Sequence, residues 1–160
     1  MLRPWVRVAE YSSIPVEDGW DVLEPTRLAV LDRGVAAALA AWPEITAAIL
    51  DRMMARARWL AFQLAVAHLR RVESRVHVTL WHFADRWGRV GPHGVELRLN
   101  LTHALLAEIV AAERPSVTLA LSTLRERGLV ERDADQVWHL HGNPPGELSD
   151  IRAQATGPLR

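Results

Sequence analysis

Apolar residues repeat at helical spacing through the middle of the chain. Between residues 45 and 67 they follow one another in steps of three and four, which places them on one face of an α-helix. Pro43 suits the first turn of such a helix, and Glu44 is favourable at its positive end. The pattern predicts one helix of about 25 residues, with an apolar face formed by Ile45, Ile49, Met53, Ala57, Leu60, Leu64 and Ala67.

A helix of this length needs a large apolar partner surface. It spans roughly 40 Å at 1.5 Å per residue, and few folds of 160 residues bury such a helix within one chain. A second stripe, Trp59, Phe62, Val66 and Leu69, widens the apolar surface further. We therefore favour a homodimer in which two copies of the helix pack together, with an interface of Ile45, Ile49, Met53, Leu60, Leu64 and Ala67. The alternative is a central core helix in a monomer.

The segments beside the long helix carry shorter patterns. Residues 1–31 show brief alternations typical of strands, enough for a hairpin or two but too few for a closed β domain. Residues 32–41 indicate a short helix. After the long helix, apolar spacing predicts a further helix over residues 72–87 that Gly88 stops. Residues 95–99 then alternate like a half-buried strand.

Residues 101–141 predict two short helices followed by a β-hairpin. Thr102 is a good N-cap for the first helix, and a break at residues 111–113 separates it from a second helix that Pro115 opens. The second helix ends at Gly128, before two short strands. This arrangement is typical of a winged helix-turn-helix, which places its second helix in the major groove of DNA. The outer face of that helix carries Arg114, Ser116, Thr118 and Ser122.

Three pieces of this region together resemble the C-terminal domain of the Crp–Fnr superfamily of cyclic-AMP-receptor-like bacterial regulators. They are Leu101-Thr102-His103, Arg114-Pro115-Ser116-Val117 and Leu124-Arg125-Glu126-Arg127-Gly128-Leu129-Val130. Trp42-Pro43-Glu44-Ile45 resembles the start of that family's dimerisation helix, and residues 75–88 resemble the helix that leads into its DNA-binding domain. The resemblance covers roughly residues 22–141.

The resemblance implies roles for the matching polar residues. Arg114 falls where the family's recognition helix carries an arginine that reads guanine, and Ser116 and Thr118 fall where side chains touch phosphate or base edges. Thr102 and His103 fall where the preceding helix meets the DNA backbone, and Ser122 lies further along the outer face. The chain departs from the family pattern at Ala104, Ala111, Glu113, Pro115 and Leu119, the last two being apolar where the family commonly carries polar readers.

The family's cyclic-nucleotide cassette, a Gly-Glu followed by an Arg-Ser/Thr-Ala type segment, has no counterpart here. Residues 1–31 resemble only the last strands of the sensor β-roll, so we expect no cyclic nucleotide binding. Either the gene product is shortened or residues upstream of Met1 are missing from this chain. The expected fold is mainly α: remnant β-roll strands and a short helix (1–43), a dimerisation helix (44–71), a winged helix-turn-helix domain (72–141) and a flexible tail (142–160).

Charge and composition add limits. The net charge is zero, but residues 52–89 hold eight arginines against two acidic residues, and every fixed cation is an arginine. Cysteine is absent, which excludes disulfides and thiolate metal sites. The seven histidines lack a metal-ligand spacing, and the seven tryptophans suit core and hinge packing better than a ligand pocket. We expect no metal, no cofactor and no enzymatic activity.

These observations favour a cytoplasmic transcription regulator that binds double-stranded DNA as a homodimer on a pseudo-palindromic operator. RNA polymerase is a further expected partner, and no apolar run approaches the ~18 residues of a membrane span. The alternative is a dimeric interaction module that pairs with full-length relatives or binds an apolar ligand at the dimer cleft. The near-neutral charge of residues 102–132, with four arginines and four glutamates, favours that alternative.

Overall fold

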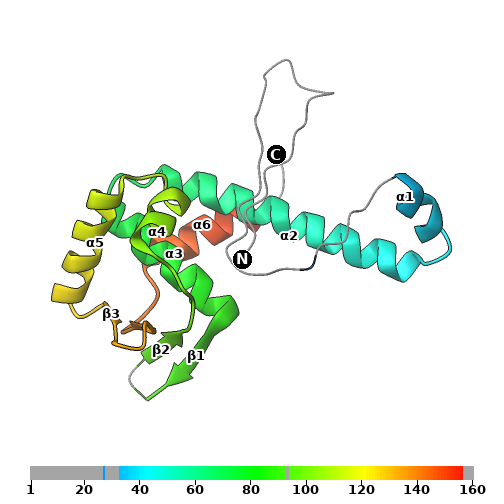
Figure 1. The fold of residues 1–160 in the computed structure, drawn as a ribbon. Coiled ribbons are helices and arrows are strands. Elements are labelled where there is room, and N and C mark those ends of the chain that lie inside the picture. Colours follow the sequence, from blue (N-terminus) through cyan, green and yellow to red (C-terminus); the bar gives the residue numbers. More distant parts are fainter. Residues whose placement is uncertain (1–26, 28–32, 93, 157–160) are drawn as a thin grey trace. The chain divides into compact units, whose positions relative to one another are not determined.

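The computed structural model describes residues 27, 33–92 and 94–156, and the chain divides into two compact units, residues 1–48 and 49–160. Over the described residues the fold is mainly α with a small sheet, and the sequence predicts a mainly α fold (Figure 1). The strands expected within residues 1–31 lie outside the described residues. The elements are α1 (Arg33–Leu39), α2 (Pro43–Ala67), α3 (Val72–Trp87), β1 (Gly88–Gly91), β2 (Gly94–Leu97), α4 (His103–Ile109), α5 (Arg114–Glu126), β3 (Val130–Arg132), β4 (Trp138–Leu140) and α6 (Gly146–Thr156).

The first unit contains α1 and the start of α2. Pro43 is the first residue of α2, where a missing backbone N–H leaves no bond unmade. The turn before it is closed by the N–H of Trp42, which donates to the carbonyl of Leu39 at 2.9 Å. The predicted helices at residues 32–41 and from residue 43 onward are confirmed.

Helix α2 shows two different faces in the second unit. Phe62 and Val66 are buried, and Trp59 and Leu69 pack against the same core. The other face is exposed and consists of apolar residues in steps of three, four, three and four, namely Leu50, Met53, Ala57, Leu60 and Leu64. The second stripe recognised in the sequence is therefore the one that faces the chain's own core, whereas the first is largely exposed.

An aromatic cluster joins α2 to α3. The His82 ring stacks on Phe62 with centroids 3.9 Å apart and on Trp59 at 5.0 Å. Phe83 and Trp87 extend the cluster along α3. Burial lowers the pKa of His82 to about 4, with smaller contributions from the positive charges of Arg152 and Arg86. His82 is therefore a neutral member of the stack near neutral pH.

Helix α3 supplies much of the core of the second unit and packs against α5, α6 and the sheet. The sheet is antiparallel with strand order β1-β2-β4-β3. β1 starts at Gly88, the residue that also ends α3. A Cβ at Gly88 would lie 2.4 Å from the carbonyl oxygen of Ala84, so only glycine fits there. The sequence identified Gly88 as a helix stop but did not predict β1, and it placed β2 slightly late, at residues 95–99.

The C-terminal segment differs from the flexible tail that the sequence suggested. Residues 146–156 form α6, which packs against α3. Leu148 and Ile151, three residues apart on one face of α6, are both buried in the main core. Two apolar residues are too few to give a clear helical period, which is why the pattern missed this helix.

Candidate nucleic-acid interface

Helices α4 and α5 form a helix-turn-helix pair whose inner faces are buried. The hydroxyl of Thr102 accepts from the backbone N–H of Leu105 at 3.1 Å and so caps α4, as the sequence predicts. Helix α5 begins at Arg114, with Pro115 in its first turn. Its inner face lies in the core and consists of Val117, Ala120, Leu121 and Leu124. Burial of this face leaves the opposite face of α5 available to a partner.

The turn between the two helices contains a strained residue held by an arginine. Ala111 has φ 52°, a left-handed conformation that a Cβ disfavours. Arg75 of α3 donates through Nη1 to the carbonyls of Ala111 and Val110, at 3.1 and 3.4 Å. Its Nε donates to the carbonyl of Leu69 at 2.7 Å, just after α2. Arg75 therefore positions the turn, a role that the sequence did not reveal.

The polar side chains predicted to face DNA differ in how free they are. The Thr118 hydroxyl donates to the carbonyl of Arg114 at 3.1 Å, and Nδ1 of His103 lies 3.0 Å from the hydroxyl oxygen of Thr118. The Ser122 hydroxyl donates to Oε1 of Glu126 at 3.2 Å. Two of the expected hydroxyl groups are thus already engaged within the protein.

His103 is held close to α5 in its neutral form. Burial lowers its pKa, and the positive charges of Arg132 and Arg114 lower it further. Because the Thr118 proton goes to the carbonyl of Arg114, Nδ1 of His103 is the donor to Thr118. In a neutral ring Nε2 then carries a lone pair and offers no proton to a phosphate.

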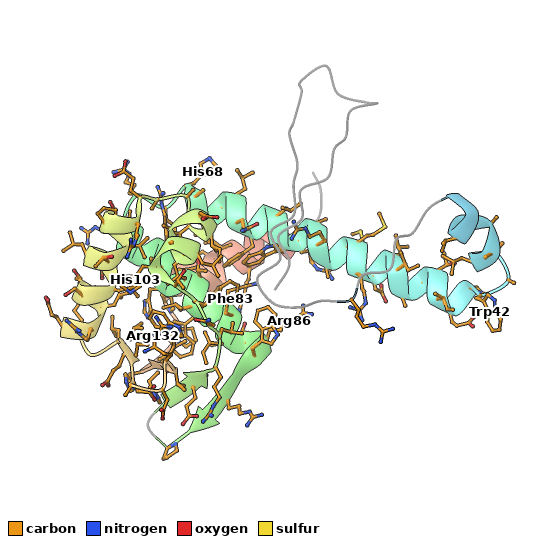
Figure 2. The ribbon with its side chains drawn as sticks, viewed as in Figure 1. Trp42, His68, Phe83, Arg86, His103 and Arg132 are labelled. Carbon is orange, nitrogen blue, oxygen red and sulfur yellow. The ribbon has the colours of Figure 1, made fainter. Side chains whose placement is uncertain are left out.

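Arg114 is exposed at the first residue of α5, and Ser116 is partly buried one residue after Pro115. The structure therefore brings Thr102, His103, Arg114 and Thr118 to the N-terminal end of the helix pair, where the side chain of His103 lies near that of Arg132 (Figure 2). Ser122 lies one further turn along α5.

A small hollow separates α5 from the hairpin β3–β4. It has a volume of about 220 Å³ and is lined by residues of both elements and by His103 of α4, among them Thr118, Arg125, Arg132 and Trp138. The Arg132 guanidinium lies 4.6 Å above the centroid of the Trp138 ring. Burial lowers the pKa of Arg132. Sequence reasoning did not single out Arg132 or Arg125. The sequence offered one signal for Arg132, namely its position as a cation at the end of a predicted strand of the wing.

The tip of the wing is acidic and ordered by Asp133. One carboxylate oxygen of Asp133 accepts from the N–H of Val137 at 2.9 Å, and the other lies 2.8 Å from Nε2 of His139. The bond with His139 is the main reason why the pKa of Asp133 lies below its usual value, and the bond with Val137 lowers it further. With Asp135 beside it, the tip offers negative charge, which disfavours a close approach to phosphate.

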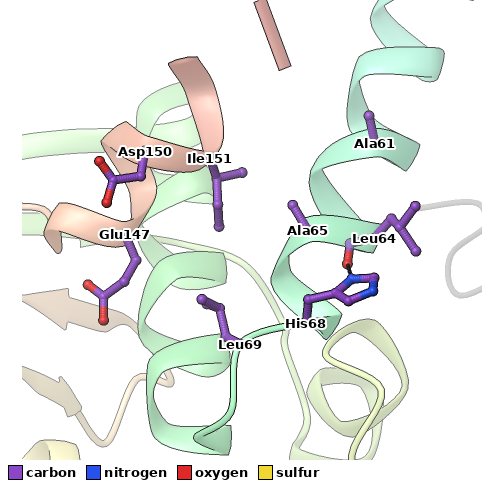
Figure 3. A pocket seen from close by; sticks show the side chains of 8 residues that line it. All are labelled: Ala61, Leu64, Ala65, His68, Leu69, Glu147, Asp150 and Ile151. Atoms are coloured by element: carbon purple, nitrogen blue, oxygen red, sulfur yellow. Dashed lines mark hydrogen bonds between the residues drawn. The ribbon is translucent and has the colours of Figure 1, made fainter. Parts of the chain in front are cut away.

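A larger hollow lies between α2 and α6 (Figure 3). It measures about 550 Å³, and its walls combine apolar side chains with two carboxylates. Nδ1 of His68 is bonded to the carbonyl oxygen of Leu64 at 2.7 Å at its edge. The lining residues are Ala61, Leu64, Ala65, His68, Leu69, Glu147, Asp150 and Ile151.

In the described part of the chain, metal-ion sites and membrane-spanning helices are both missing. Within it, no three histidine or acidic side chains are close enough together to hold a metal ion. None of the helices described there combines the length and the apolar character needed to cross a membrane.

Comparison with known sequences identifies the second unit's main domain. Residues 74–141 match the Crp-like helix-turn-helix domain. The regulatory protein CysR of Synechococcus elongatus is 32% identical over 72 residues, which are 43% of this chain and 35% of CysR. The chain therefore spans about a third of that curated relative.

Comparison with solved structures gives the same fold. A mutant of CooA from Carboxydothermus hydrogenoformans matches 78% of this chain and 55% of its own, with a TM-score of 0.64 and 17% identity. CprK complexed with OCPA matches 77% of this chain and 54% of its own, with a TM-score of 0.58 and 11% identity. At these identities the likeness concerns the fold alone.

Proposed function

We propose that this chain is a member of the Crp–Fnr superfamily, since its residues 74–141 match the Crp-like helix-turn-helix domain and CysR is 32% identical over 72 residues. It regulates transcription by binding double-stranded DNA as a homodimer on a pseudo-palindromic operator, and it does so without a cyclic nucleotide. This function requires RNA polymerase as a further partner. It also places the protein in the cytoplasm.

The observation that carries the proposal is the exposed outer face of α5 with Arg114 at its start. The helix is fixed by its buried inner face, by the capped helix α4 and by the turn that Arg75 holds. A guanidinium at this point matches the paired O6 and N7 acceptors of guanine in the major groove. Thr102 and Ser116 then set the register on the DNA backbone, whereas neutral His103 acts through its bond to Thr118.

The exposed face of α2 supports the homodimer. Met53, Leu60 and Leu64 are each at least half exposed, at 63%, 50% and 64%, and Ile45 is 44% exposed. Ile49 and Ala67 are partly buried, whereas Leu50 is exposed. The exposed apolar row, which we call the seam, has a mean spacing of 3.5 residues and consists of Leu50, Met53, Ala57, Leu60 and Leu64. That period is the one by which two helices pack as a coiled coil. We propose that the partner's α2 covers this row.

The missing cassette supports the absence of a cyclic nucleotide. A ligand phosphate needs a cradle of backbone N–H groups and an arginine, and the motif that supplies them does not occur in the 160 residues.

Selection from a random duplex pool tests the proposal. Wild type should enrich a two-fold symmetric consensus whose half-sites lie about 34 Å apart. Arg114→Ala should weaken binding by about 1–3 kcal/mol and relax preference at one base pair per half-site. Ser116→Ala should weaken all sequences alike, and Arg89→Ala, which removes an exposed charge on β1, should leave the consensus unchanged. A consensus without symmetry, or one indifferent to Arg114→Ala, contradicts the proposal.

A second candidate is a dimeric interaction module that pairs with full-length relatives or binds an apolar ligand. The hollow between α2 and α6 favours it, since about 550 Å³ is within the usual size of ligand sites. The acidic wing tip also weakens contact with DNA. This candidate predicts that no duplex is enriched and that an apolar fluorophore is displaced from the protein by its ligand.

A further inference from the structure

Leu119 is an apolar side chain on a helix face that is otherwise polar. It is 70% exposed, whereas Ala120 beside it and Val117 two residues before it are buried. In the fully described pair α4 and α5 no other large apolar side chain is exposed to this degree. Exposure shows that Leu119 does not stabilise the chain's own core.

The groups around Leu119 limit what else this face can read. Pro115, one helical turn earlier, is exposed and also apolar, and residues four apart share a helix face. Thr118 and Ser122 donate their hydroxyl protons to Arg114 O and to Glu126. Near the middle of α5 these two hydroxyl groups therefore have no proton to offer a base edge, and Pro115 and Leu119 add apolar surface beside the Arg114 guanidinium.

We propose that Leu119 is a specificity-determining residue that reads the C5-methyl group of a thymine in the major groove. The inference rests on the proposed DNA-binding function. Among the four bases only thymine presents a methyl group in that groove, and apolar side chains contact it. Leu119 lies five residues after Arg114, roughly 7.5 Å along the helix axis. The thymine therefore lies within about two base pairs of the guanine that Arg114 reads.

Deoxyuridine tests this inference because it differs from thymidine only by the methyl group. The operator is first selected with wild type, and each half-site thymine is then replaced by deoxyuridine, one symmetric pair at a time. Loss of one buried methyl weakens binding about fourfold per half-site, and about 10- to 15-fold when both half-sites are changed. Only one thymine position should show this loss.

Leu119→Ala supplies the matched protein variant. It should bind the thymine and deoxyuridine operators with equal affinity, because the contact that distinguishes them is gone. Leu119→Gln should instead prefer adenine at that position, since an amide pairs with N6 and N7 of adenine. Val90→Ala, which trims a side chain 90% exposed on β1, should keep the full deoxyuridine effect.

The outcomes separate the two proposals. A wild type that selects a symmetric operator but binds its deoxyuridine form equally well overturns the role of Leu119 and leaves DNA binding intact. An equal loss in wild type and Leu119→Ala overturns it too, because the methyl group then acts through DNA shape. A wild type that enriches no sequence overturns the proposed function, and this inference with it.

Discussion

Replacing Arg75 by methionine should loosen the turn of the helix-turn-helix without changing any residue that we propose to contact DNA. Methionine keeps an unbranched stem in the same place but removes the guanidinium. The carbonyls of Leu69 and Ala111 then lose donors at 2.7 and 3.1 Å, and that of Val110 loses a longer contact at 3.4 Å. These bonds connect the end of α2 with the turn before α5.

The size of the loss follows from the two shorter bonds. A hydrogen bond that involves a charged group contributes about 1.5–3 kcal/mol to net stability. Ala111 is exposed, so water replaces part of the bond to its carbonyl. The free energy of unfolding of Arg75→Met should therefore fall by about 2–4 kcal/mol, which places it among the larger single-residue effects.

Urea unfolding followed by circular dichroism, at one fixed protein concentration, measures this change. Arg71→Met is the matched control, because Arg71 is exposed four residues earlier and its loss should change stability by no more than about 0.5 kcal/mol. If Arg75→Met unfolds within about 0.5 kcal/mol of Arg71→Met, the guanidinium does not hold the turn and the reasoning is refuted.

Three other predictions concern the strained turn, the aromatic cluster and the exposed seam. Ala111→Gly should raise stability by about 0.5–1 kcal/mol, because relief of the left-handed Cβ exceeds the added chain entropy; an unchanged or lower melting temperature contradicts it. Since the pKa of His82 is lowered from 6.5 to about 4, the unfolded chain takes up a proton first. Wild-type stability should therefore decrease as the pH falls from about 6.5 to about 4, and His82→Phe should flatten that slope, whereas equal slopes count against it. Leu64→Glu, at a side chain 64% exposed, should give folded monomers by light scattering, and a wild type that is itself monomeric refutes the seam.

The long elements could be predicted because their apolar spacing extends over many turns. Helix α2 and its start at Pro43 agree with the sequence pattern, as do α3 and the buried face of α5. Strand β1 could not be predicted, because Gly88-Arg89-Val90-Gly91 forms a strand only through its pairing with β2. Helix α6 also depends on tertiary packing, which buries its two apolar residues.

The residue types of the candidate site could be predicted from the sequence. Which of these side chains are bonded within the protein, and which are free to contact a partner, could not. The bond between His103 and Thr118 joins residues 15 apart, and the three carbonyls held by Arg75 come from two separate segments. Such contacts leave no periodic trace. The commitment of the Thr118 hydroxyl within the protein, and the exposure of Leu119 beside it, became visible only once the helices were packed.

The direct passage from α3 into β1 makes the domain mechanically stiff. With Gly88 shared between them there is no loop that could act as a hinge, and β1, β2, β4 and β3 are bonded edge to edge. A tilt of α3 therefore carries β1 with it, and the bonds of Arg75 tie α3 to the turn before α5. A change in the direction of α3 is thus passed both to the sheet and to the turn of the helix-turn-helix.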